Sequence, residues 1–210
     1  MQKLRPVDAH RPDAAVLADA IAALRRGQLV IVPTETVYGL AADDRNPVAL
    51  EKLFEAKGRP QDKPIALLAA SVDELERHGA KLSPAARRLA DKFWPGPLTL
   101  VLASPAGWLG FRIPDHPVML ALLRAWGGVL AVTSANRSGE PPAMTAAAAL
   151  AALEPFVAFA LDAGPSAGGV PSSVVKVGAQ GIEMLRTGAI SAEAIQRVAL
   201  ESWSAGVLEK

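Results

Sequence analysis

Brief apolar runs alternate along the chain with longer segments in which apolar residues recur at helical spacing. The brief runs predict strands at residues 29–32, 37–41, 64–70, 98–103, 110–113, 129–133, 157–161, 173–177 and 182–186. The periodic segments predict helices at residues 13–26, 47–57, 84–93, 117–126, 145–153 and 191–203, with a short helix opening at Ser71. Strands mixed with helices, some joined by tight turns, indicate an α/β fold with a mixed parallel and antiparallel sheet.

A polar turn separates the strands predicted at residues 29–32 and 37–41. Pro33 cannot donate a ladder hydrogen bond, so the first strand should end there. Thr34, Glu35 and Thr36 then stand beside the core, where polar side chains need partners. Two interpretations stay open: the turn binds a ligand, or it is a bulged hairpin whose threonines bond local backbone.

A cationic loop follows the helix predicted at residues 47–57. Lys57, Arg59 and Lys63 lie in a segment stiffened by Pro60 and Pro64. Such a loop can hold a phosphate or a carboxylate, which arginine binds with two parallel hydrogen bonds. Alternatively, the cations only complement the helix dipole, an effect of ~0.3–1 kcal/mol each.

Polar residues also follow the strand predicted at residues 129–133. Thr133, Ser134 and Asn136 lie where ligands bind in open α/β sheets, beyond the carboxyl ends of strands. Their hydroxyl and amide groups can orient a ligand without adding charge. The alternative is an ordinary turn held by Asn and Ser side-chain bonds.

Three more polar residues lie in or after predicted strands. Arg112 stands between Phe111 and Ile113, so its cation either reaches solvent or meets an anion. Ser172 follows a glycine-rich loop and can offer a hydroxyl and backbone amides to an anion. Arg186 ends the strand predicted at residues 182–186, and the alternative to a ligand contact there is an ordinary surface arginine. The whole set suits an anionic ligand and favours catalysis by charge neutralisation and positioning over covalent attack.

Composition narrows the class of protein. Half of the 210 residues are hydrophobic and 20% are charged, which predicts one packed globular domain with a substantial core. The net charge of +1 argues against a general nucleic-acid-binding protein, and the lack of cysteine excludes thiolate nucleophiles, disulfides and cysteine-based zinc sites. No P-loop or dinucleotide fingerprint occurs, and the three histidines lie far apart, so no metal site is predicted. The first residues lack an apolar signal core and no run approaches a membrane span, so we expect a soluble, cytoplasmic protein without membrane contact.

Seven segments, taken together and in order, resemble the YrdC/TsaC family of threonylcarbamoyl-AMP synthases. Each segment alone is a weak signal, but seven in the family order are specific. They span roughly residues 12–190 and comprise PTETVYGL at 33–40, KGRP at 57–60 with Lys63-Pro64, WPGPLT at 94–99, RIPDHP at 112–117, SANRSG at 134–139, SSVV at 172–175 and LRTG at 185–188.

The resemblance implies a twisted mixed sheet flanked by helices around a central cationic cavity. It implies a nucleotidyltransferase that makes threonylcarbamoyl-AMP and pyrophosphate from L-threonine, bicarbonate and ATP, with Mg²⁺ accompanying the ATP. The product would pass to separate transferase proteins that modify tRNA to threonylcarbamoyladenosine, with at most weak binding of tRNA itself. The chain is similar to the short form of the family, so we expect one domain over residues 1–210, with 204–210 as a loose tail.

By resemblance, the family's site residues carry over to two groups of positions. The predicted catalytic set around the ATP phosphates is Lys57, Arg59, Ser134 and Asn136, and Lys63 and Arg186 complete the ATP site. The predicted threonine site comprises Thr34, Thr36, Arg112, Thr133 and Ser172. No general base is evident, and Glu35 is the nearest candidate.

The sequence departs from the family pattern at several positions. Lys63, Leu68, Pro171 and Thr187 stand where many members have Asn, His, Glu and Pro. These changes affect the expected threonine and ribose contacts. They keep open a paralogue that binds RNA or adenylates a different carboxylate. A carbamoyl-transfer domain of the kind fused in hydrogenase-maturation proteins is disfavoured, because no zinc-finger or acylphosphatase-like segment accompanies it.

Overall fold

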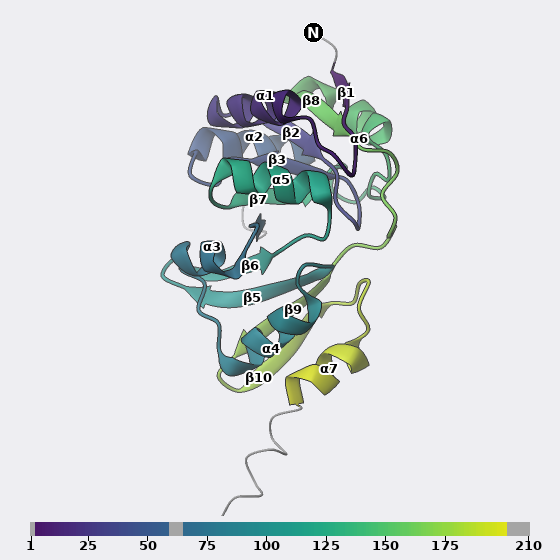
Figure 1. The fold of residues 1–210 in the computed structure, drawn as a ribbon. Helices are drawn as coiled ribbons and strands as arrows, with labels where there is room; N and C mark the ends of the chain where they lie inside the picture. The colour runs from purple at the N-terminus through teal and green to yellow at the C-terminus, as the bar shows by residue number, and fades with distance from the viewer. Residues whose placement is uncertain (1–2, 59–64, 201–210) are drawn as a thin grey trace, which may run out of the picture.

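The computed structural model describes residues 3–58 and 65–200, and within them strands and helices alternate along most of the chain (Figure 1). The strands are β1 (Leu4–Pro6), β2 (Leu29–Val32), β3 (Gly39–Ala42), β4 (Ala66–Leu68), β5 (Leu98–Ser104), β6 (Gly107–Arg112), β7 (Leu130–Ser134), β8 (Val157–Asp162), β9 (Ser173–Gly178) and β10 (Gly181–Arg186). The helices are α1 (Ala14–Arg25), α2 (Pro47–Lys57), α3 (Val72–Arg77), α4 (Pro84–Phe93), α5 (Pro117–Trp126), α6 (Ala146–Leu153), the short 3₁₀ helix η1 (Glu154–Phe156) and α7 (Ala192–Leu200).

Within the described residues, all ten strands join one sheet in the order β1-β8-β2-β3-β7-β4-β6-β5-β9-β10. The pairs β1–β8, β2–β8, β4–β6 and β5–β9 are parallel, and the other neighbours are antiparallel. The predicted α/β class with a mixed sheet flanked by helices is therefore confirmed. The short β4 lies at the middle of the sheet and links its two halves.

Helices cover the two halves of the sheet in different ways (Figure 1). At the β1–β7 end, α1 and α5 pack on one face and α2 and α6 on the other, so this half has a core on each side. At the β5–β10 end, α3, α4 and α7 build one further core. Among residues 3–58 and 65–200, no helix is long and apolar enough to cross a membrane.

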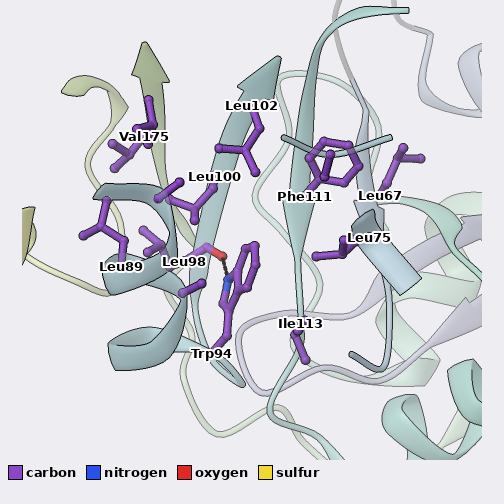
Figure 2. Packing of buried hydrophobic residues seen from close by; sticks show 14 of the residues in the cluster. Leu67, Leu75, Leu89, Trp94, Leu98, Leu100, Leu102, Phe111, Ile113 and Val175 are labelled. Carbon is purple, nitrogen blue, oxygen red and sulfur yellow. Dashed lines mark hydrogen bonds between the residues drawn. The ribbon is translucent and has the colours of Figure 1, made fainter. Parts of the chain in front are cut away.

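Trp94, which follows α4, packs in the core at the β5–β10 end (Figure 2). Its indole Nε1 donates a hydrogen bond of 2.7 Å to the Leu98 carbonyl, so the one polar atom of the ring is satisfied while the ring packs on β5. Phe111 and Leu100 are fully buried in the same cluster. Trp94 thus fixes the start of β5, from which a pocket residue projects, as described below.

Local sequence signals place the ends of α2, which carries Lys57. The Asn46 side chain accepts hydrogen bonds from the backbone amides of Val48 and Ala49, and Pro47 occupies the first turn. Gly58 ends the helix in the left-handed conformation, with φ at 56°. These signals predicted the helix correctly, and they bring Lys57 to the last turn, next to the end of β7.

Some predicted boundaries differ from the structure. The strand expected at residues 37–41 begins only at Gly39, because the Thr34 hydroxyl captures the backbone of Val37 and keeps it in the turn. The three-residue β1 escaped prediction. The strand expected at 64–70 is the shorter β4, and residue 64 lies outside the described residues, as do the end of the last predicted helix and the predicted tail at 204–210.

Candidate functional site

A pocket of about 320 Å³ lies across the middle of the sheet. Its walls come from the 34–38 turn, from the ends of β3 to β7, from the loop after β7, and from β9 and β10. Eight of the predicted site residues line it: Thr34, Thr36, Arg112, Thr133, Ser134, Asn136, Ser172 and Arg186. Segments that are far apart in sequence therefore meet at one site, as the sequence predicted.

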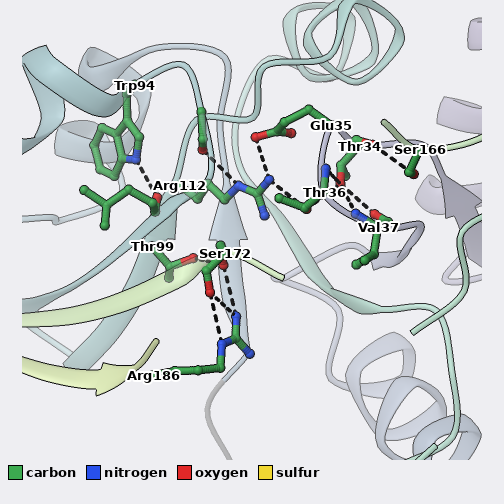
Figure 3. A network of polar contacts seen from close by, with 12 residues as sticks. Thr34, Glu35, Thr36, Val37, Trp94, Thr99, Arg112, Ser166, Ser172 and Arg186 are labelled. Atoms are coloured by element: carbon green, nitrogen blue, oxygen red, sulfur yellow. Dashed lines mark hydrogen bonds and ion pairs between the residues drawn. The ribbon is translucent and has the colours of Figure 1, made fainter. Parts of the chain in front are cut away.

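Arg112, at the end of β6, organises one wall of the pocket (Figure 3). Its Nη2 donates to Glu35 Oε1 at 2.7 Å and to Thr36 Oγ1 at 3.0 Å, and its Nε donates to the Gly96 carbonyl at 3.2 Å. The residue is only 7% exposed, so the cation meets an anion instead of reaching solvent. This decides between the two alternatives left open by the sequence.

The two threonine hydroxyls continue this chain of hydrogen bonds. Thr34 Oγ1 donates to the Val37 carbonyl at 2.6 Å, which uses its single proton. The 2.9 Å contact between the two hydroxyls is therefore donated by Thr36 to Thr34. Thr36 lines the pocket, and its hydroxyl proton is used in the hydrogen bond to Thr34. Thr36 Oγ1 can therefore accept a hydrogen bond from a ligand but cannot donate one. A ligand ammonium or hydroxyl fits this requirement.

Arg186 and Ser172 form a second polar group of the pocket, which lies beside Thr99 (Figure 3). Arg186 on β10 donates through Nη2 to the Ser172 carbonyl at 2.8 Å and to Ser172 Oγ at 3.0 Å, and through Nε to the same carbonyl at 3.0 Å. Ser172 Oγ lies 2.8 Å from Thr99 Oγ1 on β5. Arg186 is exposed, as the alternative of a surface arginine predicted, and its side chain also lines the pocket.

The loop after β7 is held from beneath by Lys57. Its Nζ donates to the carbonyls of Ser134 and Asn136 and to Asn136 Oδ1, and it lies 3.4 Å from Ser134 Oγ. Lys57 is 3% exposed and is not part of the pocket wall. Asn136 Nδ2 donates to the carbonyls of Arg137 and Glu140, so the amide also serves the loop. The phosphate contacts expected of Lys57 and Asn136 stay predictions.

Two predicted cations cannot be placed. Arg59 and Lys63 lie outside the described residues, so their part in the site is untested. The charged side chains of the described pocket wall are Arg112, Arg186 and Glu140. The predicted cationic character of the cavity stays a prediction for the same reason.

Two titratable groups lie near this site: Tyr38, which is buried, and His116, which is half-buried. Burial raises the pKa of Tyr38 to about 12, so its hydroxyl stays protonated and donates to the Gly164 carbonyl at 2.6 Å. Burial lowers the pKa of His116, while the carboxylates of Glu35 and Asp115 act in the opposite direction. Nδ1 of His116 is buried without a hydrogen-bond partner among the described residues.

Sequence reasoning missed Thr99 and Glu140 and gave Glu35 a different role. Thr99 is a hydroxyl residue within an otherwise apolar run of β5, and Thr99 and Val101 share the strand face that lines the pocket. That alternation was a usable signal. Glu35 was the nearest candidate base, but in the structure its carboxylate forms an ion pair with Arg112 at 2.7 Å. Nothing in the local sequence around Glu140 marked it as a pocket residue.

Together, the mixed sheet and its central pocket define an α/β protein with a polar pocket at its strand ends. The family model described as Sua5/YciO/YrdC, telomere recombination, matches residues 22–188. The chain therefore belongs to the Sua5/YciO/YrdC family, as the resemblance implied.

Relatives and solved structures agree with this assignment. The chain is 39% identical over 193 residues to a threonylcarbamoyl-AMP synthase of Bacillus subtilis, covering 87% of this chain and 56% of that protein. It is 39% identical over 192 residues to a putative threonylcarbamoyl-AMP synthase of Mycobacterium tuberculosis, covering 87% and 88%. The structure of P. abyssi Sua5 complexed with L-threonine superposes with a TM-score of 0.87 at 34% identity, covering 93% of this chain and 60% of that one. The chain thus spans little more than half of the B. subtilis relative.

Proposed function

We propose that this protein is an L-threonylcarbamoyladenylate synthase, a nucleotidyltransferase that converts L-threonine, bicarbonate and ATP into threonylcarbamoyl-AMP and pyrophosphate. The observation that carries the proposal is the meeting of Arg112, Arg186 and a set of strand-end hydroxyls in one pocket. Such a pocket suits a ligand with a carboxylate, an amine and phosphates. The names of the B. subtilis and M. tuberculosis relatives support the same reaction.

The reaction needs two bond-forming steps. The threonine amine attacks the carbon of bicarbonate, and loss of water leaves an N-carboxylated threonine. A carbamate oxygen then attacks the α-phosphorus of ATP, and the bond to pyrophosphate breaks. Negative oxygens crowd the site in the second step, so catalysis depends on positioning and charge neutralisation.

The pocket offers matching groups for both substrates. Arg112 would bind the threonine carboxylate, and Thr36 would accept a hydrogen bond from the amine or hydroxyl, with Thr34, Thr133 and Ser172 completing this part of the site. The ATP phosphates would lie toward Ser134 and Arg186. Mg²⁺ would arrive with ATP as part of the substrate, and Arg59 and Lys63 would add positive charge.

Downstream of the reaction, we propose that the product passes to separate transferase proteins that modify tRNA. ATP, bicarbonate and tRNA are all present in the cytoplasm, which is the location we propose.

One observation supports a second candidate, a paralogue that adenylates a different carboxylate. Leu68 and Pro171, two departures from the family pattern, both line the pocket. An apolar Leu68 and a proline without an amide donor change what the pocket can hydrogen-bond. A different amino acid could then replace threonine as substrate.

The test is mass spectrometry of the products after incubation with ATP, Mg²⁺, bicarbonate and L-threonine. We expect threonylcarbamoyl-AMP and pyrophosphate, both dependent on bicarbonate. The Arg112→Ala variant should lose most of the activity, while Arg124→Ala, a change at an exposed residue of α5, should keep it. Product only with another amino acid would favour the paralogue. No adenylate with any amino acid would refute both candidates.

A further inference from the structure

Arg112 has an uneven distribution of hydrogen bonds. Of the five N–H groups of a guanidinium, Nε uses one on Gly96 and Nη2 uses both of its own on Glu35 and Thr36. Nη1 donates no hydrogen bond to any of the described residues. The side chain lines the pocket and is buried, so its planar guanidinium is held in place with Nη1 as the one nitrogen whose N–H groups bond none of the described residues.

Glu35 holds Arg112 from behind the pocket wall. It is not among the lining residues, its side chain is 18% exposed, and its Oε2 is buried without a partner among the described residues. Its backbone carbonyl accepts a hydrogen bond of 2.9 Å from the Gly168 amide. A Cβ at Gly168 would come within 2.6 Å of that carbonyl, so the two segments are packed backbone to backbone. Glu35 is thus anchored beside the guanidinium and does not point into the cavity.

We propose that Glu35 is a positioning residue that makes Arg112 present a single nitrogen, Nη1, to the carboxylate of the amino-acid substrate. This inference rests on the proposed function, because it assigns the orientation of the substrate in that same site. With Nη2 fully used, a carboxylate cannot form the usual fork with both terminal nitrogens. The carboxylate therefore binds end-on at Nη1, and this contact sets the orientation of the substrate amine relative to its carboxylate.

The charge of Glu35 has a second consequence for the choice of ligand. A bare buried arginine attracts any anion, and a triphosphate carries far more charge than a carboxylate. The carboxylate at 2.7 Å offsets much of the charge of Arg112. Phosphate oxygens therefore gain less from Arg112 than they would from an unpaired arginine. Glu35 keeps this position for the carboxylate and leaves the triphosphate to the other cations.

The test measures steady-state kinetics of the full chain with Glu35→Gln and Glu35→Ala. We expect Glu35→Gln to raise the threonine KM about tenfold while the ATP KM changes less than about twofold, with a larger threonine effect for Glu35→Ala. Inorganic pyrophosphate should become a stronger competitor against threonine. Glu76→Gln, which removes the carboxylate from the exposed ion pair with Arg87, is the matched control and should change neither KM.

A double-mutant cycle separates positioning from a general structural effect. Because Glu35 acts through Arg112, Glu35→Gln should add less than about twofold to the threonine KM when Arg112→Lys is already present. An equal effect in both backgrounds, or equal effects on threonine and ATP, would overturn the inference.

Calorimetric titration with L-threonine measures the dissociation constant directly, so this test of the inference does not depend on catalytic turnover. If the wild-type protein binds threonine but makes no adenylate, the proposed function fails, and the same variants still test Glu35 through the dissociation constant. If product forms normally in Glu35→Gln, the inference fails alone. If the wild-type protein does not bind threonine at all, both are wrong.

Discussion

Removing the Lys57 ammonium should destabilise the protein, because this group holds the loop after β7. In Lys57→Met, the carbonyls of Ser134 and Asn136 and the Oδ1 of Asn136 lose a donor. Each buried acceptor that is left without a partner costs about 1–3 kcal/mol. Methionine removes the cost of burying the lysine charge, but the loss at three acceptors is larger than this gain. We expect the free energy of unfolding to fall by ~3 kcal/mol, the lower part of the range for breaking a buried charged network.

The assay is urea unfolding followed by tryptophan fluorescence. Lys52→Met is the matched control, because Lys52 lies on the same helix, is exposed and makes one hydrogen bond of 3.3 Å to the Gly27 carbonyl. It should change stability by less than ~0.5 kcal/mol. Hydrogen exchange should locate the damage in the loop after β7, where the Ser138 amide bonds the Lys57 carbonyl.

A loss below ~1 kcal/mol in Lys57→Met, with exchange in the loop unchanged, would refute the reasoning. If such a stable variant also lost ATP binding, the Lys57 ammonium would have to move to the phosphates, as the family resemblance implies. Stability and nucleotide binding measured on one variant therefore separate a loop-holding lysine from a ligand-binding one.

Three further predictions concern the surroundings of the pocket. In Gly188→Ala the new Cβ would lie 2.4 Å from the Pro171 carbonyl oxygen, so the free energy of unfolding measured by urea titration should fall by ~2 kcal/mol. Gly128→Ala, with no neighbour nearer than 3.9 Å, is the control and should be nearly neutral. Tyr38→Phe should lose ~1–2 kcal/mol, because the Gly164 carbonyl loses its donor; an unchanged midpoint would contradict this. Burial holds the pKa of His116 in the folded protein below 6.5, so the unfolded chain binds the proton more readily than the folded protein does. The free energy of unfolding should therefore fall as the pH drops below 6.5 toward the folded-state pKa. His116→Leu should show a flatter decline in urea unfolding between pH 7.5 and 5.5, and equal slopes would contradict the assignment.

Local chemistry explains which elements could be predicted from the sequence. The apolar runs and caps around α2, α4 and α5 placed these helices correctly, because their signals lie within a few residues of each end. β1 has three residues and exists because it pairs with β8, more than 150 residues later in the chain. Periodicity within a short window carries no record of such a pairing.

Eight of the residues that line the pocket were predicted from the sequence, but their network of hydrogen bonds was not. Polar residues at strand ends pointed to the right segments, and the family resemblance grouped them. The partner of Arg112 was beyond reach, because Glu35 lies 77 positions away and the choice between solvent and an anion depends on the folded sheet. The hydrogen bonds of Lys57 to the loop after β7 were beyond reach for the same reason, because Ser134 lies 77 positions away in the sequence.

The polar groups of the pocket also bind the two halves of the sheet together. The hydrogen bond from Arg112 to Thr36 joins β6 to the turn between β2 and β3, on the far side of the short β4. Because these groups satisfy one another, the pocket can be ordered before any ligand enters, and less free energy is lost in ordering it on binding. A substitution at Thr36 or Arg112 should therefore affect both substrate binding and the attachment of one half of the sheet to the other. For this reason, the kinetic variants above need their own unfolding curves, since a weakened pocket and a loosened sheet would both lower activity.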